Sequence, residues 1–189
     1  MTHPIQMIGA LAIPAITENI YPDSDSSVSI WRDEGGSSSN IYQSVNSTSQ
    51  NDSTYAKLNS PNVIVNVCPT TETRMIRFGM ENPSAQPSPY QNVDVYVRSK
   101  IVDPYTTGFT ATLDIELLEG TTTQRATGTG FSVSSSEFGS DYFSLTTNEI
   151  NSVTDWDNLY VKATWEVCAD DLDADLNIYC SWIYIQFTP

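Results

Sequence analysis

The residue types that catalyse reactions or bind metals are few in this chain and widely spaced. The only histidine is His3, and the three cysteines are Cys68, Cys168 and Cys180. Nucleophilic Ser–His–Asp or Cys–His sites need an imidazole beside the nucleophile, and the usual zinc sites need closely spaced Cys and His ligands. The 23 acidic residues allow many carboxylate pairs of the glycosidase kind, but none is singled out. The sequence therefore predicts a protein that is not an enzyme and needs no cofactor.

The most motif-like feature is an acidic run, DDLDADLN, at residues 170–177. Asp171, Asp173 and Asp175 repeat at every second position, as at the start of a helix-loop-helix calcium loop. The run then departs from that loop, because Leu176 replaces the turn glycine and Trp182 replaces the bidentate glutamate. Two interpretations stay open: a calcium site at a hairpin tip, or a solvated acidic turn that protects a sheet edge from aggregation, which we prefer.

Two of the cysteines flank this acidic run. Cys168 and Cys180 would face each other if the run is the tip of a hairpin centred near Ala174. Cross-strand neighbours can satisfy disulfide geometry, so a Cys168–Cys180 bond is one expectation and a pair of half-buried thiols is the other. Cys68 is left unpaired in either case and is expected to be a small core residue.

Hydrophobic residues alternate with polar ones along most of the second two thirds of the chain. The alternation is clearest at 63–67, 92–101, 110–118 and 160–168, and further strands fit at about 74–80, 122–129, 139–146 and 177–187. Glu119–Gly120 indicates a hairpin turn, and Thr146 with Glu149 has the spacing of a helix capping box. We predict an all-β fold, an antiparallel jelly-roll-type β-sandwich with about eight strands, one short helix and an extended N-terminal arm.

The arm is predicted at residues 1–21, and the sandwich domain at 22–189. Glu18 is the only acidic or basic residue among the first 20, and an apolar cluster precedes it. The cluster consists of Ile5, Met7, Ile8, Leu11, Ile13 and Ile16. Such a segment is too apolar to stay in water, so it either lines the edge of its own domain or binds a neighbouring subunit.

The net charge of −15 excludes some partners. Phosphate binding needs clustered Lys and Arg, and an acidic chain is repelled by anionic lipid surfaces, so neither nucleic acid nor membrane is expected as a partner. The start of the chain lacks the basic region of a secretory signal. The four tryptophans raise the alternative of sugar binding, but strand parity places Trp165 in the core, and packing is the preferred role for Trp31, Trp156 and Trp182.

The C-terminal half resembles a known family. FSLTTNEINSVTDWDNLYVKATW and the closing CSWIYIQFTP are similar to a jelly-roll domain common in virion proteins of tailed bacteriophages. The resemblance lies in an ELLEG-like turn at Glu116–Gly120, a short helix at Thr146–Val153, the segment Val153–Leu159, a long strand at Tyr160–Cys168, and Ser181–Trp182 near the end. The acidic hairpin is a departure, because many relatives have a glycine-rich turn there.

This resemblance implies a virion structural protein, most simply a decoration or cement protein on the outer surface of a phage head. The implied partners are the major capsid protein and further copies of the chain, as a trimer rather than a dimer. The implied location is the capsid surface, after assembly in the host cytoplasm. The alternative is a carbohydrate- or receptor-binding module of a tail or fibre, because domains of this kind resemble those too.

Overall fold

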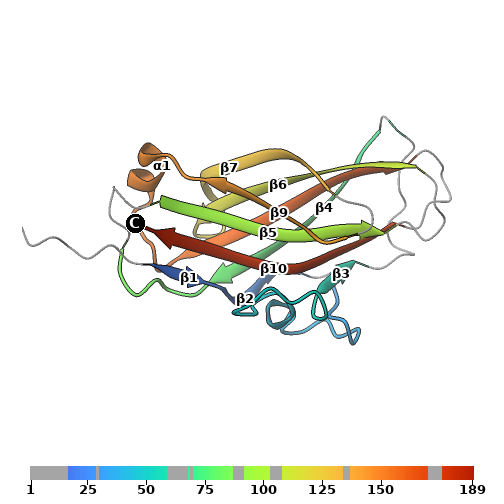
Figure 1. Ribbon diagram of the computed structural model, residues 1–189, viewed down its shortest axis with the longest axis horizontal. Helices are drawn as coiled ribbons and strands as arrows, with labels where there is room; N and C mark the ends of the chain where they lie inside the picture. The colour runs from blue at the N-terminus through green and yellow to red at the C-terminus, as the bar shows by residue number, and fades with distance from the viewer. Residues whose placement is uncertain are drawn as a thin grey trace, which may run out of the picture.

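The computed structural model describes residues 17–28, 30–58, 68, 70–86, 92–102, 108–133, 137–169 and 176–189. In these residues ten strands form two five-stranded antiparallel sheets that pack face to face (Figure 1). The structure also contains one short α-helix and one short 3-10 helix. The predicted all-β sandwich is therefore confirmed, and three of these ten strands, all within residues 18–58, were not among the eight expected.

We name the two layers sheet A and sheet B. Sheet A has the order β1-β10-β5-β8, and β3 also pairs with β10. Its strands are β1 (Glu18–Ile20), β3 (Ala56–Leu58), β5 (Asn92–Val102), β8 (Gly139–Ser144) and β10 (Asn177–Thr188). Sheet B has the order β2-β4-β9-β6-β7. Its strands are β2 (Pro22–Ser27), β4 (Glu72–Met80), β6 (Phe109–Glu119), β7 (Thr123–Ser132) and β9 (Leu159–Ala169).

The connections between these strands produce a jelly roll. From β4 to β10 each strand lies in the other sheet from the one before it, except at the β6–β7 hairpin. Sequential strands in a jelly roll cross between the layers in this way, so each sheet pairs strands that are distant in sequence. The long central pairs, β10 with β5 and β6 with β9, each run over eleven register partners.

The core lies between the sheets and follows strand parity. Val93, Val95 and Val97 of β5 are fully buried, and so is Trp165 of β9. The Trp165 indole Nε1 donates a hydrogen bond to Ser99 Oγ across the core at 3.2 Å. A polar atom buried without a partner would cost free energy, so this pairing lets the large ring occupy the centre of the sandwich. Parity thus predicted Trp165 correctly as a core residue.

The two predicted turn features are present. Gly120 has φ 63°, a left-handed conformation that glycine adopts without steric cost, and it closes the β6–β7 hairpin. Helix α1 (Thr147–Ser152) begins after Thr146, whose side chain accepts from the Glu149 N–H while the Glu149 side chain accepts from the Thr146 N–H. This is the predicted capping box. The helix and the C-terminus lie at the same end of the sandwich (Figure 1).

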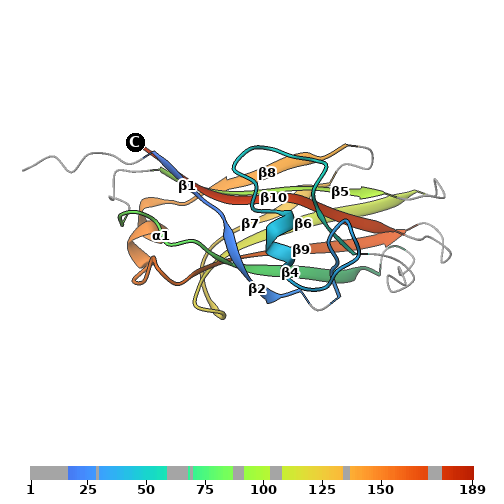
Figure 2. The same ribbon diagram turned by 90° about the horizontal axis from the view of Figure 1, so that it is seen from below.

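One long side of the sandwich is closed by the segment between β2 and β3, as Figure 2 shows. Trp31 and Ile41 are fully buried there, and the Trp31 ring lies 5.3 Å from that of Trp165. The short helix η1 (Ile41–Ser44) is held by Asp25, whose carboxylate accepts from the backbone N–H groups of Ile41 and Tyr42 at 2.9 and 2.7 Å. Packing is therefore the role of Trp31, as predicted.

Two predictions concern the N-terminal arm and the strand expected at 63–67. The expected strand at 63–67 and the arm residues before 17 lie outside the described residues. Glu18–Ile20, which the sequence placed in the arm, form β1 and pair with β10. Among the described residues, no helix is long and apolar enough to cross a membrane.

Candidate functional site

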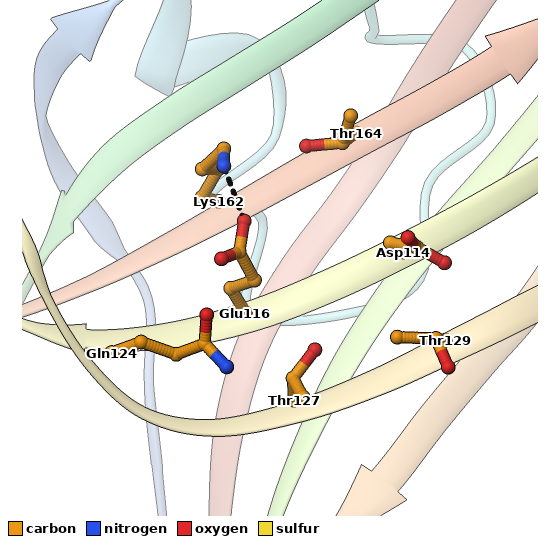
Figure 3. Close-up of a pocket in the computed structure, with 7 residues that line it drawn as sticks. All are labelled: Asp114, Glu116, Gln124, Thr127, Thr129, Lys162 and Thr164. Atoms are coloured by element: carbon orange, nitrogen blue, oxygen red, sulfur yellow. Dashed lines mark ion pairs between the residues drawn. The ribbon is translucent and has the colours of Figure 1, made fainter.

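A polar hollow of about 300 Å³ lies on the outer face of sheet B (Figure 3). Its side chains come from three adjacent strands, β6, β9 and β7, because alternate residues of each strand point away from the core. The residues that line it are Asp114, Glu116, Gln124, Thr127, Thr129, Lys162 and Thr164. A second hollow of about 270 Å³ shares Glu116, Gln124 and Lys162 with it and extends to β4. We call the two together the polar groove.

The charged groups of the polar groove are already engaged within the protein. Lys162 of β9 forms an ion pair with Glu116, its register partner on β6. Asp114 accepts a hydrogen bond of 2.8 Å from the backbone N–H of Gly130, which has φ 74° and so requires glycine at the irregular end of β7. The two carboxylates project from the same strand and do not face each other across the hollow (Figure 3). This arrangement suits polar recognition better than a glycosidase pair.

Thr164 is the unusual residue of the polar groove. Its hydroxyl oxygen is buried, and it is the one buried side-chain polar atom without a hydrogen-bond partner among the described residues. Buried hydroxyls are nearly always paired, since an unmade hydrogen bond costs free energy. Thr164 lies opposite Asp114 and Met75 in the sheet, so its side chain is at the middle of the strands that line the groove.

The outer face of sheet A carries a different chemistry, a row of tyrosines. Tyr142, Tyr96 and Tyr184 are register partners on β8, β5 and β10, and we call them the tyrosine row. The Tyr96 ring stacks on Tyr184 at 4.4 Å and on Tyr142 at 4.9 Å. Trp182 contacts the Tyr184 end at 4.3 Å, whereas Tyr142 at the other end is 52% exposed. The sheet thus holds a rigid aromatic band that ends at an exposed ring.

The stacking decides what the tyrosine row can bind. Both faces of the Tyr96 ring are occupied by its neighbours, so it offers no flat face to a sugar ring. Burial raises the pKa of Tyr184 to about 12, and Tyr96, Tyr21 and Asp94 add to the effect. Burial also raises the pKa of Tyr96, so both phenols stay neutral. A neutral, preorganised aromatic band is typical of a surface that binds another protein.

A loop covers the Trp182 end of this band. The Arg98 guanidinium donates two hydrogen bonds to Asp52, at 2.8 and 2.7 Å, and these lower the pKa of that carboxyl. The Trp182 indole Nε1 donates to the Ser47 carbonyl at 2.6 Å. These contacts hold the segment between η1 and β3 against sheet A. Trp182 is half-buried by packing, and Trp156 is buried near α1, so packing is the observed role of both.

The cysteine predictions were wrong. Cys168 forms a disulfide with Cys68, with a Cα–Cα distance of 5.1 Å, and Cys180 is a free, fully buried thiol. The physical reason is that Cys168 lies next to the last residue of β9 in sheet B, whereas Cys180 lies in β10 of sheet A, so the two strands do not form a hairpin ladder. The Cys68 N–H donates to the Ala169 carbonyl at 3.0 Å, which places Cys68 beside the end of β9.

The other predicted site residues lie outside the described residues. These are the arm residues Ile5, Met7, Ile8, Leu11, Ile13 and Ile16 and the acidic residues Asp171, Asp173 and Asp175. Within the part of the chain that the structure describes, no cluster of His, Cys, Asp and Glu could hold a metal ion. The calcium interpretation of the acidic run therefore stays a prediction.

Sequence reasoning placed some residues of both surfaces on polar strand faces but did not bring them together. The alternation put Asp114, Glu116, Lys162 and Thr164 on outward faces, and it put Tyr96 there too. The missing information was the register between strands that are distant in sequence. A tyrosine at an outward position in each of three strands was the one available signal for the tyrosine row.

No family description matches the chain, and no curated protein matches its sequence. A chain from a structure of infectious bursal disease virus, Gt strain, is similar with a TM-score of 0.43 and 11% identity, over 93% of this chain and 32% of that one. The CBM22-1 xylan-binding domain of Xyn10C from Paenibacillus barcinonensis has a TM-score of 0.38 and 7% identity, over 94% and 97%. A Stig cyclase, Fisc, from Fischerella sp. TAU has a TM-score of 0.35 and 10% identity, over 89% of each chain. These likenesses concern the β-sandwich alone.

Proposed function

We propose that this protein is a non-enzymatic virion structural protein of a tailed bacteriophage, which decorates the outer surface of the head and stabilises it. The observation that carries the proposal is the tyrosine row on the outer face of sheet A. Protein interfaces are enriched in Tyr, Trp and Arg, and sheet A presents Tyr142 at the end of a band that also includes Trp182 and adjoins Arg98. The sequence resemblance to phage jelly-roll domains supports the virion assignment.

The tyrosine row is prepared for binding before a partner arrives. Tyr142 is stacked on Tyr96, which is itself fixed by Tyr184, so docking needs little further ordering of side chains. Binding that avoids such ordering keeps more of the interaction free energy as affinity. The proposed partner is the major capsid protein. A chain with a net charge of −15 is steered toward a basic patch on that partner.

The apolar N-terminal segment adds a second contact. Strand β1, which follows the six apolar residues in the sequence, lies at the edge of sheet A and pairs with β10. A segment of 16 residues can extend up to roughly 55 Å, enough to reach a neighbouring subunit. Burial of its side chains would supply association free energy, and two linked contacts bind more tightly than either alone. We expect self-association at a symmetry axis, as a trimer.

The disulfide fits a protein that works in a released particle. Cys68–Cys168 joins residues 100 positions apart in the sequence. Disulfides are rare in a reducing cytoplasm and persist outside it. In the proposed sequence of events the chain assembles on heads in the host cytoplasm, and the bond forms once the virion meets an oxidising medium.

The test is co-sedimentation of the purified protein with expanded heads of its parent phage. Four forms are compared: the full chain, a truncation that lacks residues 1–16, Tyr142→Ser, and the control Tyr160→Ser on the outer face of sheet B. The full chain and the control should bind at fixed stoichiometry, while the truncation and Tyr142→Ser should bind roughly tenfold or more weakly. No binding of the full chain to heads, or binding to tails alone, would overturn the proposal.

A further inference from the structure

The polar groove on sheet B has the properties of a ligand site that the proposed function does not use. It lies on the sheet opposite the tyrosine row, and its two hollows adjoin through Glu116, Gln124 and Lys162. Each hollow is close to the lower limit of about 300 Å³ for small-molecule pockets. The groove therefore suits a ligand with two small units in a row, or a longer chain that lies across the strands.

The lining of the groove matches a molecule that has hydroxyls on its rim and apolar faces. Threonine hydroxyls, the Gln124 amide and carboxylate oxygens supply both donors and acceptors. The second hollow adds the apolar side chains of Met75 and Leu118. A sugar ring has hydroxyls at its periphery and C–H groups on its faces, so it can use both kinds of contact.

The charges of the groove select a neutral ligand. Its two acids, Asp114 and Glu116, are balanced by the cations Arg77 and Lys162, so the lining has no net charge. Both cations already have acceptors in the protein: Lys162 has Glu116, and Arg77 donates to the Thr121 carbonyl at 2.6 Å. An anionic ligand would find no free cation in the groove and would meet a chain of net charge −15.

Thr164 gives an independent sign that this site can hydrogen-bond a ligand. Its buried hydroxyl has no partner among the described residues, although it lines the hollow. A ligand hydroxyl that displaces the side chains covering the Thr164 hydroxyl would supply this hydrogen bond. We propose that the polar groove binds a neutral saccharide of two or more units, and that Thr164 and Gln124 donate or accept its hydroxyl hydrogen bonds.

The test uses the purified full chain and a panel of neutral oligosaccharides built from glucose, galactose, mannose, xylose or N-acetylglucosamine, with sialyllactose as the anionic comparison. Backbone amide chemical shifts report binding and its location. At least one neutral oligosaccharide should shift amides of β6, β7 and β9. Thr164→Val and Gln124→Ala should each weaken that affinity about five- to tenfold, the loss expected for one hydrogen bond.

Two controls separate this site from the rest of the molecule. Thr112→Val makes the same substitution on the same sheet face outside the groove, and Tyr142→Ser alters the opposite face; both should bind the sugar as the unaltered chain does. The proposal is overturned if no neutral oligosaccharide binds, if sialyllactose alone binds, or if the shifted amides lie on sheet A. Binding to heads is a separate measurement, so either proposal can fail while the other stands.

Discussion

Replacement of Thr164 by valine should make this protein more stable. The Thr164 hydroxyl is buried and has no partner among the described residues, so folding removes it from water without compensation. Such a group costs about 1–3 kcal/mol. Valine has nearly the same shape, and its second methyl group occupies the place of the hydroxyl without that cost. We therefore expect the free energy of unfolding to increase by about 1 kcal/mol.

The increase is measurable by urea denaturation followed by tryptophan fluorescence, because Trp165 is fully buried in the core and reports on global unfolding. For a domain of this size, about 1 kcal/mol corresponds to a rise in Tm of roughly 2–4 °C. The matched control is Thr112→Val, on the same face of the same sheet, because the Thr112 hydroxyl is not a buried group without a hydrogen-bond partner. The control should change the free energy of unfolding by less than about 0.5 kcal/mol.

A loss of stability in Thr164→Val would refute this reasoning. A decrease of about 1 kcal/mol or more would show that the hydroxyl makes a hydrogen bond in solution, and the argument that it is reserved for a ligand would then fail. The opposite pair of results, higher stability with weaker sugar binding, is the pattern of a residue kept for function at the expense of stability.

Three further predictions concern the cysteines and one ion pair. Cys180 should resist iodoacetamide in the native protein and react fully in denaturant, because burial raises the pKa of its thiol to about 12 and excludes the reagent. Mass spectrometry would measure the extent of alkylation in each condition. Reduction of Cys68–Cys168 should lower the free energy of unfolding by roughly 4–5 kcal/mol, as expected for closure of a loop of this length, measured by denaturation with and without reductant. Arg98 lowers the pKa of Asp52, so the Arg98–Asp52 ion pair stabilises the folded protein fully above the unfolded pKa of 3.8, and this stabilisation is lost as the pH falls through the lower folded pKa. The Tm difference between the unaltered chain and Asp52→Asn should therefore shrink between about pH 5 and about pH 2.

The fold could be predicted because strand parity is a local property. One buried residue at every second position is visible in the sequence of β5, β6 and β9, and the capping box of α1 is visible in Thr146 and Glu149. These signals need no knowledge of the partner strands. Strands β1, β2 and β3 were not among the eight expected: β1 and β3 have only three residues each, too few for a period to show, and β2, PDSDSS, has no alternation of apolar and polar residues.

The sites could not be predicted because they depend on pairing between distant strands. Cys168 and Cys180 flank a short connection, which suggests a hairpin, but in a jelly roll that connection crosses from sheet B to sheet A. The true partner, Cys68, is 100 positions away. Lys162 and Glu116 likewise meet only because β9 and β6 are neighbours in sheet B. Loop length and alternation carry no information on this order.

The opposite placement of the two surfaces gives the proposals a common geometry. Sheets A and B pack through their inner faces, so the tyrosine row and the polar groove point away from each other. A protein attached to a head through sheet A would present sheet B, with its polar groove, to the medium. Many copies on one particle would then display many weak sugar sites, and multivalency would convert them into firm attachment to a glycan-bearing surface. Decorated heads should therefore bind an immobilised neutral polysaccharide far more tightly than the free protein does, and heads decorated with Thr164→Val should lose most of that gain.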